Sequence, residues 1–217
     1  MTDSLIIILL TSTFIIALMH TVIAPDHYFP IIAVSRANHW SVKKTVIMTI
    51  LCGLAHVLPS VLLAILSILI GLTLSNMQAF DSLRGNIAGW FLITYGLFYL
   101  IWGVYKLYRH QTHFHHHHMT SDPKEMTPYM LILLFIISPC EPLIPLILYP
   151  GLEGSPLAVV LVTIIFTLVT IITMLFIVLA LVFGANMIKT SFFEKYRHVI
   201  SGTIIFSNGV AIKLLSL

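Results

Sequence analysis

The sequence predicts an all-α integral membrane protein with six transmembrane helices, arranged as two inverted three-helix repeats whose first and fourth helices are broken by proline. The first reason is composition, because only 9% of the 217 residues are charged, 59% are hydrophobic and the mean hydropathy is +1.02. A soluble domain carries about 25% charged residues. The second is a series of apolar runs long enough to cross a bilayer, and the third is that prolines and ionisable residues interrupt two of these runs at matching places.

The six runs take up nearly the whole chain, so we expect a single polytopic membrane domain, residues 1–217, with no second soluble domain. They lie at about Leu5–Ala24, Thr45–Leu72, Ile87–Leu107, Tyr129–Tyr149, Leu157–Phe183 and Val199–Leu217. We expect the first run to stay in the mature protein, because it has no basic leader and exceeds the apolar stretch of a signal peptide. The repeat halves are about 1–108 and 126–217, joined by a His-rich loop, 109–125.

Basic residues near the ends of the runs predict the orientation. The loops after the first, third and fifth runs hold nine of them, whereas the other side has Arg84 and Lys213. The nine are Arg36, Lys43, Lys44, Lys106, Arg109, Lys124, Lys189, Lys195 and Arg197. We therefore expect these loops in the cytosol and both termini outside, in the inner or plasma membrane of a prokaryote.

Ionisable residues at the end of the first run and inside the second predict a metal site. His20, Asp26 and His27 surround Pro25, which should interrupt the helix, and His56 lies in the second run. Imidazole and carboxylate groups suit divalent first-row metals. The alternative is that the first three are hydrated at the headgroup level, with Asp26 capping a short helix, and that His56 is a hydrogen-bonded packing residue.

A second proline-rich segment interrupts the fourth run and includes Cys140 and Glu141. Asp26 and Glu141 each precede a proline by four positions, with two aliphatic residues following, so the two segments resemble each other. Paired interrupted helices in two halves indicate a transporter binding site. We therefore expect Cys140 and Glu141 to contribute to the metal site. The alternatives are a simple kink with a protonated Glu141, and packing roles for Cys140 and Cys52.

A histidine tract in the central loop predicts a second, auxiliary role in metal capture, buffering or sensing. Its members are His110, His113, His115, His116, His117 and His118. An inert polar loop is the alternative.

The segments His20–His27 and Cys52–His56 resemble the His-x5-Asp-His and Gly-Leu-x-His signatures of the UreH-type urease-accessory membrane proteins. These are relatives of the nickel/cobalt transporters and, more distantly, of the DsbD/CcdA electron carriers. Ser138-Pro139-Cys140 is similar to the Ser-Pro-Cys of the wider DsbD-like superfamily. The larger nickel/cobalt permeases use His-x4-Asp-His in eight spans, and DsbD/CcdA carriers place a cysteine in each half, so this chain departs from both patterns.

The leading hypothesis is transport of a divalent transition-metal ion, nickel or cobalt first and zinc or iron second, by alternating access. One alternative is a thiol-disulfide electron carrier using Cys52 and Cys140. Another is an accessory protein that hands metal to a urease-like apoenzyme. We expect no enzymatic site, no prosthetic group and no nucleic-acid partner. The expected partners are the bilayer and the metal ion, with a homo-oligomer or a metallochaperone left open.

Overall fold

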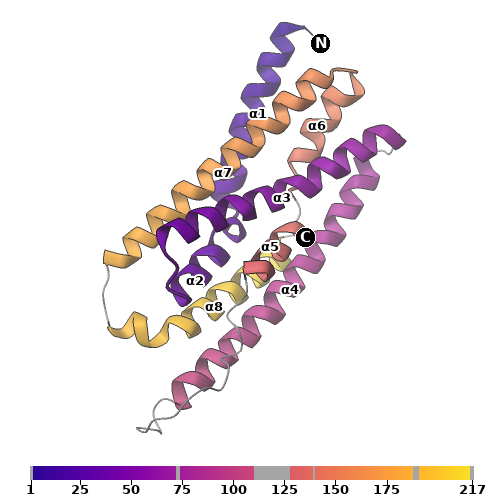
Figure 1. Ribbon diagram of the computed structural model, residues 1–217. Coiled ribbons are helices and arrows are strands. Elements are labelled where there is room, and N and C mark those ends of the chain that lie inside the picture. The colour runs from indigo at the N-terminus through magenta and orange to yellow at the C-terminus, as the bar shows by residue number, and fades with distance from the viewer. Residues whose placement is uncertain (1, 72–73, 110–127, 139, 188–190, 216–217) are drawn as a thin grey trace.

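The computed structural model describes residues 2–71, 74–109, 128–138, 140–187 and 191–215. These residues form helices and no strand (Figure 1). In chain order the elements are α1 (Asp3–Ile23), the 3-10 helix η1 (Pro25–His27), α2 (Phe29–Ala37), α3 (Val42–Ile70), α4 (Leu74–Arg109), α5 (Pro128–Ile137), α6 (Leu143–Leu152), α7 (Pro156–Met187) and α8 (Ser191–Leu215).

Four stretches of the described residues are long and apolar enough to cross a membrane: Asp3–Ile23, Val42–Ile70, Ser82–Leu107 and Pro156–Gly184. They correspond to the first, second, third and fifth predicted runs. The fourth run is divided into the short helices α5 and α6, and the sixth is α8, which is not among the four. The prediction of an all-α membrane protein is thus confirmed, whereas the count of six spans stays a prediction.

Both predicted breaks are present. The first comes at Ala24, whose backbone is extended with φ −90° and ψ 96°, and Pro25 then begins η1. The second lies between Ile137 and Leu143, where α5 ends and α6 begins. Proline removes a backbone donor and disfavours helical geometry in the residue before it, which explains why the chain leaves the helix at these places.

The long helices pack in pairs. α1 lies along α7, α3 crosses α7, and α5 packs on α3 (Figure 1). α4 and α8 form the closest pair, because a Cβ atom added at any of four glycines would lie closer than 3.0 Å to the backbone or side chain of the partner helix. These glycines are Gly96 and Gly103 of α4 and Gly202 and Gly209 of α8. Small residues let membrane helices approach this closely.

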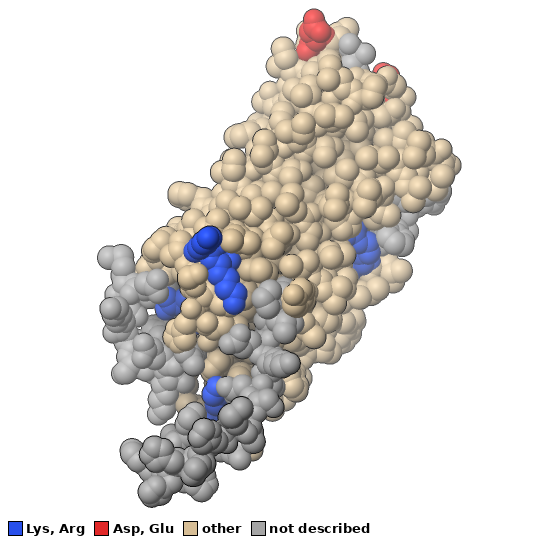
Figure 2. All heavy atoms as spheres, viewed as in Figure 1, with Lys and Arg blue, Asp and Glu red and all other residues tan. Residues whose placement is uncertain are grey.

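Polarity is inverted relative to a soluble protein. Large apolar side chains face outward, as at Leu69, which is 77% exposed, and Phe176, which is 74% exposed. The inner face of α3 is instead polar and small, and its buried residues include Thr45, Thr49, Cys52, His56, Ser60 and Ser67. Figure 2 shows a broad belt without charged residues on one face, with acidic groups at one end and basic groups toward the other. The outward face therefore suits lipid, and polar chemistry lies inside.

Candidate metal site

The first break brings two histidines together. His20 lies in the last turn of α1, and its carbonyl accepts a hydrogen bond from the N–H of Ala24, which ends the helix. In a continuous helix, residues seven apart are separated by about 10.5 Å along the axis. The turn through η1 instead leaves the ring centroids of His20 and His27 4.7 Å apart, edge to face. The break is thus what creates this pair of imidazoles.

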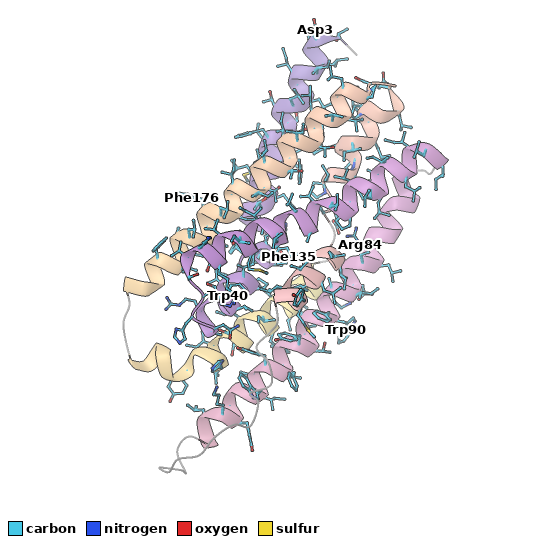
Figure 3. The ribbon with its side chains drawn as sticks, viewed as in Figure 1. Asp3, Trp40, Arg84, Trp90, Phe135 and Phe176 are labelled. Atoms are coloured by element: carbon cyan, nitrogen blue, oxygen red, sulfur yellow. The ribbon has the colours of Figure 1, made fainter. Side chains whose placement is uncertain are left out.

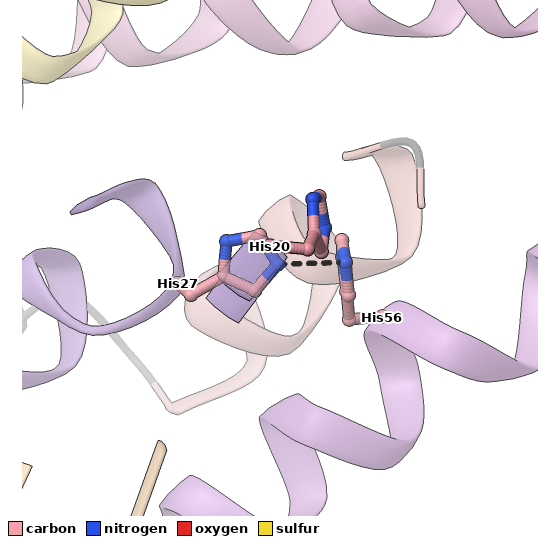
Figure 4. Close-up of side chains that lie close together, drawn as sticks. All are labelled: His20, His27 and His56. Carbon is pink, nitrogen blue, oxygen red and sulfur yellow. Dashed lines mark hydrogen bonds between the residues drawn. The ribbon is translucent and has the colours of Figure 1, made fainter. Parts of the chain in front are cut away.

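The third imidazole comes from α3. His56 lies on the buried polar face of α3, and its ring centroid is 4.4 Å from that of His27 and 6.2 Å from that of His20. The Nε2 atoms of His27 and His56 are 3.0 Å apart (Figure 4). One ring nitrogen from each of the three histidines lies within 4.8 Å of the other two. Three helical segments therefore deliver their donor atoms to one point.

The surroundings are buried and partly apolar. His27 is 2% exposed and His56 is 1% exposed. Phe166 of α7 packs 6.4 Å from the ring of His20, and Phe135 of α5 packs 6.2 Å from the ring of His56. The imidazoles of His27 and His56 are thus shielded from water, whereas that of His20 is partly exposed.

Asp26 supports the cluster from behind. Its Oδ1 atom is 3.4 Å from Nδ1 of His27, the ring nitrogen that does not face His56. A carboxylate at this position accepts a hydrogen bond from Nδ1–H and leaves Nε2 with its lone pair, the arrangement found behind many metal-ligating histidines.

Two buried ring nitrogens of the histidine cluster, Nε2 of His20 and Nδ1 of His56, have no hydrogen-bond partner among the described residues. An unsatisfied buried polar atom is costly. A cation bound among the three rings would provide a partner for Nε2 of His20. Neutral imidazoles are ligands for nickel, cobalt, zinc, copper and iron, so the donor set fits a transition-metal ion.

Of the other predicted ligands, Cys140 and Glu141 do not join the histidine cluster. Cys140 is fully buried in an apolar cluster with Leu143 and Phe166, and its N–H donates to Oγ of Ser60 over 3.2 Å. Glu141 is exposed. The turn between α5 and α6 points neighbouring residues in opposite directions, so only one of the two faces inward. Their roles as ligands stay a prediction.

The two cysteines are both buried, do not form a disulfide and belong to different parts of the interior. Cys52 packs with Met48 and Met174, whereas Cys140 packs in the cluster that contains Phe166. The predicted capture histidines, His110, His113, His115, His116, His117 and His118, lie outside the described residues.

Three residues around the site were not predicted from the sequence: Ser60, Phe135 and Phe166. Ser60 follows His56 by four positions on the same helix face, and this spacing is a signal that the sequence does contain. The two phenylalanines are indistinguishable in the sequence from the other aromatic residues of the apolar runs.

Comparison with protein families shows that residues 30–211 match the cytochrome c biogenesis protein transmembrane region. The match includes Cys52, His56 and Cys140 and begins after His27. It confirms the resemblance to the wider DsbD/CcdA-like superfamily, while the UreH-type resemblance stays a prediction. Neither the curated proteins nor the solved structures gave a match. Because the matched region covers most of the chain, the protein belongs to the family of cytochrome c biogenesis protein transmembrane regions.

Proposed function

We propose that this protein carries a divalent transition-metal ion across the membrane, nickel or cobalt first, and holds it at His20, His27 and His56. The observation that carries the proposal is the convergence of three imidazoles from α1, η1 and α3, of which those of His27 and His56 are buried and that of His20 is partly buried. Placing an ionisable residue at membrane depth costs free energy, and the residues found there typically line ion pathways or proton relays. Simple packing would not require three of them around one point.

The Nε2 atoms of His27 and His56 are 3.0 Å apart and share a hydrogen bond, so one of them carries a proton. A metal ion held by both nitrogens would take the place of that proton, because ligating imidazoles are neutral and offer a lone pair. Imidazole suits nickel, cobalt and zinc alike. The preference for nickel or cobalt in this proposal therefore rests on the resemblance of His20–His27 to the UreH-type signature.

The order and packing of the helices support the proposed inverted repeat. Each half consists of a broken helix followed by two long ones, α1 to α4 in the first half and α5 to α8 in the second. α1 packs on α7, and the corresponding α5 packs on α3, as exchange of the two halves requires. In our proposal, rocking of the halves exposes the ion to each side in turn. The histidine tract would collect the ion on the cytosolic side.

The test is uptake by purified protein in liposomes, with nickel, cobalt, zinc and ferrous iron supplied separately. The background protein carries serine at the six tract histidines, so that the tract does not bind the metal being measured. We expect nickel or cobalt uptake by this protein and at least a tenfold loss in the His27→Ala variant. His39→Asn is the matched control, because His39 is exposed in the turn after α2 and its φ of 49° suits asparagine.

Equal uptake by the His27→Ala and control proteins for all four metals would contradict the proposal. Metal binding without uptake would instead favour the accessory protein that hands metal to a partner. The liposome measurement therefore separates these two roles of the same site.

A thiol-disulfide electron carrier is the second candidate, favoured by the family match, which covers both cysteines. Against it, Cys52 and Cys140 lie in different clusters of the interior. Replacement of both by serine decides the matter. A double variant that still moves nickel like the wild type shows that nickel transport needs neither thiol. Disulfide exchange between the wild type and a thioredoxin-like partner that is lost in the double variant would support the second function, and absence of exchange in the wild type would contradict it.

A further inference from the structure

At the break between α5 and α6, backbone N–H and C=O groups lose their helical hydrogen bonds, and lipid offers no groups to replace them. A helix leaves its last carbonyls without partners, and irregular backbone at membrane depth is tolerated only where other groups of the protein replace water. Two side chains of the first half fill this role, Arg84 from α4 and Ser60 from α3. Neither residue was expected to have a function.

Arg84 binds the carbonyl end of α5. Its Nη2 atom donates to the carbonyl of Ile136 over 2.9 Å and to that of Ser138 over 3.4 Å. Figure 3 labels Arg84 on α4 and Phe135 at the end of α5. The negative end of the helix dipole favours a cation here, and a charged donor strengthens each hydrogen bond. A guanidinium can serve two carbonyls at once.

Ser60 binds the other side of the break. Its hydroxyl oxygen accepts the N–H of Cys140, and both residues are fully buried. Ser60 is one turn from His56 on α3. Phe135, next to the carbonyl that Arg84 binds, packs against the ring of His56. The hydrogen bonds of Arg84 and Ser60 therefore hold the segment between α5 and α6 against α4 and α3. They lie on either side of the contact between Phe135 and His56.

We propose that Arg84 and Ser60 are positioning residues that hold the break closed over Cys140, so that this thiol becomes reactive only when their contacts open. The inference goes beyond metal transport, because it concerns access to the thiol and applies whether the break moves for an ion or for thiol exchange. A closed break explains why Cys140 is fully buried beside Glu141, which is exposed.

The test uses the two native cysteines as reporters. N-ethylmaleimide is added to the full-length protein in detergent, and mass spectrometry gives separate labelling rates for Cys140 and Cys52. We expect Arg84→Gln and Ser60→Ala each to raise the rate at Cys140 on the order of tenfold, because a lost buried hydrogen bond favours local opening by about that factor. Cys52, buried in α3 away from the break, should keep its wild-type rate.

Lys213→Gln is the matched control, because Lys213 also contacts α4, at Asn86, but lies on α8. It should change neither rate. Arg84→Lys, which keeps the charge, should restore much of the protection of Cys140. Ser60→Ala carries the test should Arg84→Gln not fold. Unchanged Cys140 labelling in the Arg84 and Ser60 variants overturns the proposal. An equal rise at both cysteines also overturns it, because that result indicates general loosening.

Discussion

His27 is the residue on which the site depends, because its two ring nitrogens have different partners. Nδ1 faces the carboxylate of Asp26, and Nε2 faces His56 at 3.0 Å. When Nδ1 carries the proton, Nε2 has the lone pair that a metal ion requires. The carboxylate thereby favours the tautomer of His27 in which Nε2 is available to the proposed metal ion.

Replacing Asp26 tests this arrangement. The Asp26→Asn variant keeps the shape of the side chain but loses its negative charge, so Nε2 of His27 becomes a weaker donor. We expect nickel affinity to fall about 10- to 100-fold, the usual cost of removing such a partner. Isothermal titration calorimetry measures this affinity, with serine at the six tract histidines in both the variant and the reference protein.

Asp3→Asn is the control for Asp26→Asn, since Asp3 is exposed at the other end of α1. An Asp26→Asn protein that binds nickel as tightly as the wild type would show that the carboxylate does not act through His27.

Among the secondary-structure elements, the end of α1 is essential to the histidine cluster. Pro25 prevents the helix from continuing, and the chain turns back so that His27 meets His20. The sequence spacing of seven residues agreed with one face of a straight helix as well as with a broken one. Only the broken form brings the two rings into contact.

Pro25→Ala should therefore weaken metal binding without unfolding the protein. Alanine permits α1 to continue through Asp26 and His27, which would move the two imidazoles toward a separation of about 10 Å. We expect at least a tenfold loss of nickel affinity with unchanged or higher helix content by circular dichroism. Pro30→Ala is the control, because Pro30 lies in the first turn of α2, where proline is tolerated. Equal losses in both variants would contradict this role of Pro25.

The contact between α4 and α8 requires glycine on both helices. Its helices run antiparallel, because Gly96 faces Phe206 whereas Gly103, farther along α4, faces Val199, which is earlier on α8. A methyl group at Gly96 would collide with the backbone of Phe206, and backbone cannot move aside as a flexible side chain can.

Gly96→Ala is thus expected to lower the free energy of unfolding by about 1–3 kcal/mol, the cost of overpacking a tight interface. Gly184→Ala in α7 has nothing within 4 Å of the added Cβ atom and should be neutral or stabilising by up to about 1 kcal/mol. Thermal unfolding of both variants in the same detergent provides the comparison. Equal midpoints would show that α4 and α8 are not in close contact.

For the whole molecule, the two ends differ in charge. Asp3 lies at the start of α1 and Trp40 near the start of α3, toward opposite ends of the bundle (Figure 3), and Lys44 is stacked over the ring of Trp40. The excess of basic residues at the second end predicts that this end faces the cytosol.

Labelling of introduced cysteines tests the orientation. Asp3→Cys should react with a membrane-impermeant maleimide in intact cells, whereas Lys44→Cys should react only after the membrane is permeabilised. Both positions are exposed, and the buried Cys52 and Cys140 provide the background rate. The reverse pattern would place the proposed histidine tract outside the cell.

The sequence by itself determined the class, the positions of the breaks and a set of six candidate ligands that includes the three histidines. Composition and the length of the apolar runs are determined by the bilayer, and proline affects only the backbone next to it. These features can therefore be predicted without information on contacts between distant parts of the chain. The number of spans was harder to predict, because α5 and α6 are each too short to cross a bilayer and their arrangement depends on the helices they pack against.

Only the tertiary structure decided which predicted ligands meet. His56 joins His27 although 29 residues separate them, because α3 turns its polar face inward. Glu141 and Cys140 are neighbours in sequence, yet one is exposed and the other is buried beneath the contacts of Arg84 and Ser60 with the break. The direction in which a side chain points at a broken helix depends on the partners of the freed backbone groups. Here those partners lie about 50 to 80 residues away in the chain.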